Sequence, residues 1–285
     1  MSSVFFTDTD CEMHYTDAES LGIQVIGMPY TIKGQESVYD FGKNTDVKQF
    51  FADMRSGEIA TTAALNSQDY LDYFEPVLAS GKDILYVHFS SKLSGTFDYM
   101  KTAINILMEK YPDRKITCFD TENICLGAGI QVIEACKLHN AGASDEDVVK
   151  FLTEFKDKVG IYFYVDSLQY LKRGGRISSM SATFGTLLNI KPILSINEGK
   201  LEKLTTVKGT KKAVDFLFDK FNTEYDNNPE REVFIIDADN KLVADELAEK
   251  VRTSGKNVTL RRMDIGPVIG AHAGPGTVGI VFAKK

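Results

Sequence analysis

The spacing of apolar residues along the chain constrains its fold more than any other feature of the sequence. Short runs of β-branched and aromatic residues alternate with longer segments in which apolar residues recur every three or four positions. The run at residues 84–89 predicts a buried strand, and the spacing from Leu93 to Leu107 then predicts a helix. This alternation is typical of an α/β protein whose strands are mainly parallel.

The same alternation covers the first 158 of the 285 residues. Besides the strand at 84–89, it predicts strands at 4–7 and 115–119, an apolar stretch at 23–28, and helices at 46–55, 67–78 and 126–138. Ser144 and the three acidic residues after it predict a further helix start, because acids stabilise the positive end of a helix dipole. Ser90 and Ser91 are candidate N-caps for the helix that follows the strand at 84–89. We therefore expect an N-terminal parallel α/β domain over residues 1–158.

The pattern changes after residue 158. A strand is predicted at 161–165, and two alternating segments at 191–196 and 200–206 flank Asn197-Glu198-Gly199, which indicates an antiparallel hairpin. Helices at 211–225 and 242–254 and strands at 232–237, 258–263 and 277–282 complete the prediction. We therefore expect a C-terminal mixed α/β domain over residues 159–285, with a ligand site between the two domains.

The charge and cysteine content narrow the classes of partner and compartment. Lys and Arg number 33 against 40 Asp and Glu, and the net charge of −7 disfavours nucleic-acid binding. The four cysteines form no CxxC pair, which predicts neither a disulfide framework nor a zinc site and favours a cytoplasmic location. No leader pattern and no apolar run of about 18 residues is found, so we expect no export signal and no membrane-spanning segment.

The common catalytic signatures are missing from the sequence. No GxxxxGK[ST] phosphate loop, HExxH or GxSxG motif is present, and no cofactor is expected. Gly127-Ala128-Gly129 lacks the third glycine of a dinucleotide fingerprint, so helix packing is the favoured interpretation, with an amphipathic helix from Gln131 onward.

The segment Ser90-Ser91-Lys92-Leu93-Ser94-Gly95-Thr96 joins a predicted strand to a predicted helix. Its hydroxyls and the free N–H groups of the first helical turn favour an anion such as a carboxylate or a phosphate. A plain N-cap needs only one of these hydroxyls. The two interpretations, anion site and helix cap, both remain open at this stage.

Two further segments are candidates for function. A loop over residues 265–276 carries four glycines and two prolines around His272, and such a loop is expected to be rigid and to hold the imidazole in place. The stretch Leu171-Lys172-Arg173-Gly174-Gly175-Arg176-Ile177 places three cations in one turn. These cations fit an anionic ligand, an acidic partner, or simple solvation.

Taken in order, these segments resemble the motifs of the DegV family of bacterial fatty-acid-binding proteins, and the resemblance runs over nearly the whole chain. The matching segments are Thr7-Asp8-Thr9-Asp10, Ser90 to Thr96, Phe119-Asp120-Thr121, Leu171 to Ser178, Lys191-Pro192-Ile193-Leu194 and Gly266 to Gly276. The resemblance implies that a long-chain fatty acid lies in a tunnel between two α/β domains. It also implies a binding protein, not an enzyme, that presents the carboxylate to a separate ATP-dependent fatty acid kinase, with transient membrane contact left open.

The resemblance also implies roles for individual residues. Ser94 and the Gly95 amide would bind the fatty-acid carboxylate, Thr62 would supply a second hydroxyl, and His272 would approach from the C-terminal loop. Arg176 would support the head-group network or the contact with the kinase. Phe184 and Leu187 are attributed to core packing rather than to the tunnel wall.

One departure from the family pattern and one alternative function accompany this interpretation. The family usually has T-S-Q-P-S where this chain has Thr62-Ala63-Ala64-Leu65-Asn66. This change is expected to widen the tunnel mouth or make it more apolar, to alter lipid preference, or to weaken the handover to the kinase. The alternative is a serine-dependent hydrolase or transferase in which His272 activates Ser94 as the nucleophile.

Overall fold

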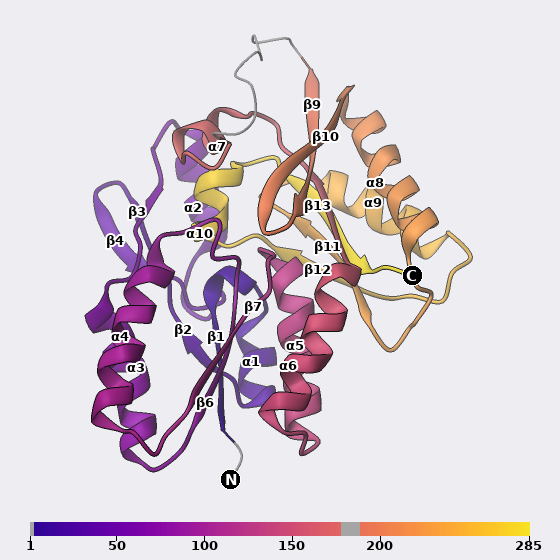
Figure 1. Ribbon diagram of the computed structural model, residues 1–285. Helices are drawn as coiled ribbons and strands as arrows, with labels where there is room; N and C mark the ends of the chain where they lie inside the picture. Colours follow the sequence, from indigo (N-terminus) through magenta and orange to yellow (C-terminus); the bar gives the residue numbers. More distant parts are fainter. Residues whose placement is uncertain (1–2, 178–188) are drawn as a thin grey trace.

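The computed structural model describes residues 3–177 and 189–285 as an α/β protein with two main sheets (Figure 1). Ser178, Phe184 and Leu187 lie outside the described residues. In the described ranges, no helix is both long enough and apolar enough to cross a bilayer. The predicted fold class is confirmed, because one main sheet is parallel and the other is mixed.

The first main sheet has four parallel strands. Their spatial order is β2 (Gln24–Ile26), β1 (Val4–Asp8), β6 (Ile84–His88) and β7 (Ile116–Asp120). Figure 1 shows α3 (Ser67–Ala79) and α4 (Thr96–Lys110) on one side, and α1 (Tyr15–Leu21), α5 (Leu126–Asn140) and α6 (Asp145–Phe155) on the other. Burial on both faces explains why β6 consists almost entirely of apolar residues.

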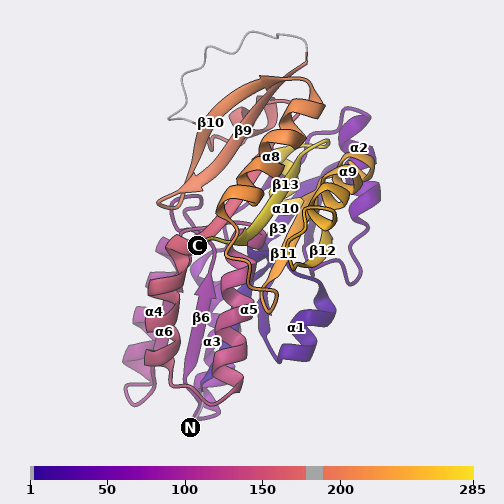
Figure 2. The same cartoon turned by 90° about the vertical axis from the view of Figure 1, so that its right-hand side faces the viewer.

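The second main sheet has six strands. Their spatial order is β10 (Lys200–Lys208), β9 (Ile190–Asn197), β8 (Val159–Tyr164), β13 (Val278–Ala283), β11 (Glu232–Asp237) and β12 (Thr259–Asp264). All neighbours pair antiparallel except β11 and β12. The predicted hairpin is confirmed, with Gly199 at a φ of +78° in its turn. Helices α8 (Thr210–Glu224) and α9 (Lys241–Arg252) cover one face of this sheet (Figure 2).

A third, small sheet was not predicted. It consists of β4 (Gln35–Val38), β3 (Pro29–Ile32) and β5 (Thr61–Thr62), and it lies beside α2 (Val47–Arg55). Its strands are too short to show a clear alternating pattern; β5 has only two residues. This sheet matters for the site because β3 and β5 contact α10 (Pro267–Ala273), which comes from the other end of the chain.

The structure corrects the prediction of a loop around His272. Residues 267–273 form α10, because Pro267 at its start has no N–H to lose and a φ that suits the first helical turn. A second unpredicted helix, α7 (Gln169–Arg173), packs against α10. Pro267 therefore begins a short helix and Gly274 ends it, where the prediction had a rigid loop.

Helix α5 also differs from the prediction, which gave it one polar face. It lies between the two main sheets, contacts strands of both, and is buried along its length from Leu126 to Ile133. Gly129 explains its close approach to η1 (Thr9–Cys11): a Cβ there would lie 2.4 Å from the Cys11 carbonyl oxygen. Because α5 joins the two sheets, the domain boundary at residues 158/159 stays a prediction.

The prediction that Ser90 or Ser91 caps α4 is wrong. The N-cap of α4 is Gly95, and no side chain bonds to the helix from that position. The Ser90 hydroxyl is engaged elsewhere, because it donates to the Gly199 carbonyl at 2.7 Å. By contrast, Ser144 caps α6 as predicted, accepting a hydrogen bond from the Asp147 amide.

Candidate functional site

The site lies at the carboxyl ends of β1 and β6, which are neighbours in the parallel sheet. From β1 the chain crosses to β2 on one side, and from β6 it crosses to β7 on the other side. The strand ends at such a reversal leave a crevice that is the usual ligand site in parallel α/β sheets. Asp10 follows β1, and Ser94 and Gly95 follow β6, so both connections lead to the same place.

A cavity occupies this crevice. The space open to the centre of a water molecule is about 150 Å³. Most of its lining is apolar, contributed by Met28, Ala63, Ala64, Phe89, Leu93, Ile124, Phe163, Leu171, Leu201, Val268, Ile269 and Ala273. The polar lining residues are Asp10, Thr62, Ser94, Gly95, Arg176 and His272. The structure thus brings all five predicted site residues onto one cavity, from segments up to 210 residues apart.

Thr62 and His272 form a direct pair across this cavity. The Thr62 hydroxyl lies 2.8 Å from His272 Nε2, which joins β5 to α10. Burial, and secondarily the charge of Arg176, lowers the pKa of His272 to about 4, so the imidazole is neutral near pH 7. His272 Nδ1 is buried and has no hydrogen-bond partner among the described residues.

Ser94 and Gly95 present hydrogen-bonding groups from the start of α4. The Ser94 hydroxyl oxygen accepts from the Thr96 amide at 3.3 Å, which leaves its own proton free to donate. The first N–H groups of a helix have no partner inside the helix, and they favour a negative charge. Ser94 lies one residue before the N-cap Gly95, and its free hydroxyl proton fits the anion site.

The geometry does not support the alternative in which His272 activates Ser94. His272 Nε2 is bonded to Thr62, and in the described part of the chain no hydrogen bond joins His272 to Ser94. A serine nucleophile needs its base within hydrogen-bonding reach. The pair that the structure provides is threonine with histidine.

Arg176 acts electrostatically on both His272 and Asp10, and His272 bonds to Thr62, so these polar lining residues cluster and form the polar end of the cavity. Arg176 Nε donates to the Leu93 carbonyl at 3.2 Å, and Nη1 donates to the Gly174 carbonyl. Partial burial lowers the pKa of Arg176, and the nearby carboxyl of Asp10 opposes that shift. Of the three cations predicted in this turn, Lys172 and Arg173 are exposed, and only Arg176 lines the cavity.

The segment that departs from the family pattern, Thr62 to Asn66, lines the cavity and contacts the starts of α3 and α4. Ala63 and Ala64 are exposed and line the cavity, so the cavity opens to the surface there. Leu65 is buried, and its carbonyl accepts from the Thr96 hydroxyl at 3.3 Å. Asn66 caps α3 in a reciprocal arrangement with Asp69. Two small, exposed alanines therefore stand at the opening, and the helix behind it keeps its cap.

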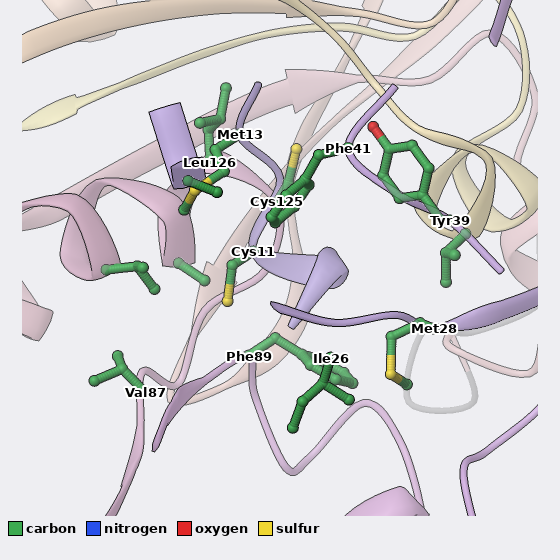
Figure 3. Packing of buried hydrophobic residues seen from close by; sticks show 14 of the residues in the cluster. Cys11, Met13, Ile26, Met28, Tyr39, Phe41, Val87, Phe89, Cys125 and Leu126 are labelled. Carbon is green, nitrogen blue, oxygen red and sulfur yellow. The ribbon is translucent and has the colours of Figure 1, made fainter. Parts of the chain in front are cut away.

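Three buried acids beneath the cavity were not predicted as site residues. Asp8, Asp10 and Glu12 occupy alternate positions on and after β1, and all three are buried. Their chain neighbours Cys11 and Met13 belong to the apolar cluster shown in Figure 3. Burial raises the pKa of Asp8 to about 7 and that of Glu12 to about 8, and it raises the pKa of Asp10 well above its usual range. The sequence signal that could have indicated these residues is the position of several acids directly after a predicted buried strand. Among residues 3–177 and 189–285, no such group has the arrangement to hold a metal ion.

The fold and the cavity together define a class of protein: a two-sheet α/β protein with an apolar internal cavity that has one polar end. Comparison with known families then shows to which family of that class the chain belongs. The family described as "Uncharacterised protein, DegV family" matches residues 4–285. The chain belongs to the DegV family.

Individual relatives agree with this assignment. A DegV domain-containing protein of Clostridium perfringens is 36% identical over 280 residues, which cover 98% of this chain and 96% of the relative. A solved structure described as "Fatty Acid Binding of a DegV family Protein from Thermus thermophilus" is 27% identical with a TM-score of 0.85, covering 99% of this chain and 100% of that chain. "DegV, a fatty acid binding protein from Bacillus subtilis" is 27% identical with a TM-score of 0.84, and the match covers both chains fully.

Proposed function

We propose that this protein binds one long-chain fatty acid, with the hydrocarbon tail in the apolar part of the cavity and the carboxylate at its polar end. The observation that carries this proposal is the single polar end, where Thr62, Ser94, Gly95 and His272 converge in an otherwise apolar cavity. The Thermus thermophilus and Bacillus subtilis relatives are both described as fatty-acid binding, which supports the same ligand class.

The tail would supply most of the affinity. Burying one methylene contributes about 0.8 kcal/mol, so roughly fifteen methylenes contribute on the order of 12 kcal/mol before the costs of ordering the ligand. The head group then needs hydrogen-bond donors rather than a closed ion pair, whose net contribution is uncertain when buried. The Ser94 hydroxyl and the Gly95 amide meet this need without a full charge.

The Thr62–His272 pair has two arrangements, and the ligand would select one. If Nε2 carries the proton, it donates to the Thr62 oxygen, and the threonine hydroxyl is free to donate to the carboxylate. If Nδ1 carries the proton, Nε2 accepts from the Thr62 hydroxyl, whose proton is then not available to the carboxylate. The free donor of the pair is in that case the buried Nδ1–H. A carboxylate at the polar end favours the first arrangement, because it turns the hydroxyl proton toward the anion.

We further propose that the bound carboxylate is presented to a separate fatty acid kinase. Exposed Ala63, Ala64 and Gly95 line the cavity next to the proposed carboxylate position, so this end would be accessible to a partner. Arg176 also lines an adjoining hollow with Lys92 and Lys200, which suits it to the head-group network or to the kinase contact. The chain has no phosphate loop of its own, so ATP chemistry would belong to the partner.

The test of ligand binding begins with the purified protein. Denaturing mass spectrometry should release a fatty acid of about sixteen to eighteen carbons, and protein stripped of lipid should take up the labelled acid. Ser94→Ala should retain about tenfold less ligand, because it loses a donor to a charged group. Ser91→Ala is the matched control, since Ser91 does not line the cavity. Protein that is empty and also fails to take up fatty acid would refute the proposal.

Kinase presentation requires a separate test. Addition of a fatty acid kinase and ATP to the loaded protein should yield an acyl phosphate, and Arg176→Ala should reduce the yield. Retained lipid binding with no acyl phosphate from any tested kinase would contradict the presentation role alone.

A further inference from the structure

Asp10 is a buried acid that faces the cavity and has an unsatisfied oxygen. The residue is 5% exposed and lines the same cavity as Ser94 and His272. Its Oδ1 is buried and has no hydrogen-bond partner among the described residues. Buried polar atoms in folded proteins nearly always have a partner, so a cavity-lining carboxyl with one oxygen unpartnered by the protein is a candidate ligand contact.

Hydrogen bonds hold the backbone of Asp10 on both sides. The Asp10 amide donates to Asp8 Oδ1 at 3.1 Å, and the Asp10 carbonyl accepts from the Cys125 amide at 2.9 Å. These bonds anchor η1 to β1 on one side and to the start of α5 on the other. The backbone from which the Asp10 side chain extends is therefore held in place beside the cavity.

The surroundings of Asp10 disfavour its ionised form. An ionised carboxylate without donors is costly in an apolar interior. Burial is the main cause that raises the pKa of Asp10 well above its usual range, and the neighbouring carboxyls of Asp8 and Glu12 add to the shift. Arg176 opposes the shift but does not cancel it. A protonated carboxyl has one O–H donor and so can satisfy an acceptor in the cavity.

We propose that Asp10 keeps its proton in the folded protein and donates a hydrogen bond to the carboxylate of the bound fatty acid. This inference rests on the proposed function and adds to it a positioning residue that the sequence motifs did not indicate. Asp10 lines the same cavity as the Thr62 and Ser94 hydroxyls but comes from a different segment, the end of β1, whereas Thr62 lies on β5 and Ser94 follows β6. The proton stays on Asp10, and no covalent step is involved.

The arrangement makes ligand retention depend on pH in one direction. As the pH rises, Asp10 loses its proton and becomes a second carboxylate facing the first, so donation is replaced by repulsion. The other titratable or charged groups around Asp10 are Asp8, Cys11, Glu12, Tyr70, Cys125, Arg176 and His272. His272 has already lost its proton below neutral pH, so it does not contribute to a change in the alkaline range.

The experiment measures the affinity of the full chain for a fluorescent long-chain fatty acid from about pH 6 to about pH 10. The wild type should bind more weakly as the pH rises. Asp10→Asn keeps a donor but cannot titrate, so its affinity at neutral pH should stay within about fivefold of wild type and should not fall with pH. Asp10→Ala should bind about 10- to 100-fold more weakly at neutral pH, because it loses a donor to a charged group.

Glu12→Gln is the matched control. Glu12 is another buried acid with a raised pKa, but it is satisfied by the Tyr39 hydroxyl and the Gly266 amide and does not line the cavity. This variant should keep the alkaline loss of affinity, with its midpoint moved to lower pH because one neighbouring negative charge is gone. The same dependence in Asp10→Asn as in wild type would overturn the inference.

A spectroscopic measurement locates the proton independently. The ¹³C shift of a carboxyl-labelled fatty acid bound to wild type should be that of an ionised carboxylate at neutral pH. A shift typical of a protonated acid would place the proton on the ligand and overturn the role of Asp10. A wild type that binds no fatty acid at any pH would refute the proposed function itself, whereas normal binding by a folded Asp10→Ala would refute only this inference.

Discussion

Replacing Thr62 by valine tests whether the threonine–histidine pair is part of the ligand site. Valine keeps the branched shape that suits β5, so the backbone pairing with Tyr30 of β3 should persist. The substitution removes the hydroxyl that lies 2.8 Å from His272 Nε2. His272 Nδ1 already lacks a partner, so both ring nitrogens would then be without a protein partner in the free protein.

The magnitude of the effect follows from these contacts. Leaving a buried polar group unsatisfied costs about 1–3 kcal/mol. In a protein of this size, about 1 kcal/mol corresponds to roughly 2–4 °C in the unfolding midpoint, so Tm should fall by about 2–12 °C. If Thr62 also donates to the fatty-acid carboxylate, Thr62→Val should weaken ligand binding by about 10- to 100-fold.

The assay pairs thermal unfolding of the lipid-free protein with fatty-acid titration at neutral pH. Thr61→Val is the control, because Thr61 is the exposed neighbour on the same two-residue strand and makes the same change in side-chain chemistry. It should leave both Tm and affinity near wild type. If Thr62→Val lowers Tm as expected but binds fatty acid normally, Thr62 only supports His272, and its assignment to the head-group site is refuted.

Two further predictions concern the support beneath the cavity. Gly129→Ala would place a Cβ 2.4 Å from the Cys11 carbonyl oxygen and 2.6 Å from that of Glu12. Because these are backbone atoms that cannot move easily, the substitution should lower the free energy of unfolding, measured in urea, by about 1–3 kcal/mol. A variant as stable as the wild type would show that α5 and η1 are less tightly packed. Burial raises the pKa of Glu12 from 4.5 to about 8, so its contribution to stability is fully present below about pH 4.5 and is lost as the pH rises through about 8. Urea unfolding at stepped pH should therefore show a decline that is shallower in Glu12→Gln, and identical slopes would contradict the raised pKa.

The elements that the sequence predicted well are those with long, regular patterns. The helix expected at 67–78 is observed as α3, and the hairpin around Asn197-Glu198-Gly199 is observed with the expected antiparallel pairing. The helix around His272 was missed because its glycines and prolines resemble a loop when read locally. Packing against α2, α7 and the small sheet supplies the stability that such a short segment lacks by itself.

In the candidate site, too, some residues could be predicted from the sequence and one could not. Ser94, Gly95, Arg176, Thr62 and His272 stand in recognisable segments, so a sequence reading could single them out. Asp10 stands in the motif Thr7-Asp8-Thr9-Asp10, but the resemblance did not imply a site role for it. Only the absence of a partner for its buried oxygen sets it apart, and that property exists only in three dimensions.

The sequence by itself determined the α/β class, most of the helices and strands, and the family, because these depend on residue spacing and on motifs that are local in the chain. The tertiary structure decided that His272 pairs with Thr62 and not with Ser94, that α5 lies between the sheets, and that Asp10 lines the cavity. These facts depend on which distant segments share one interior. In that interior, burial sets the protonation of the acids and of the histidine, and no local pattern encodes the solvent exposure on which it depends.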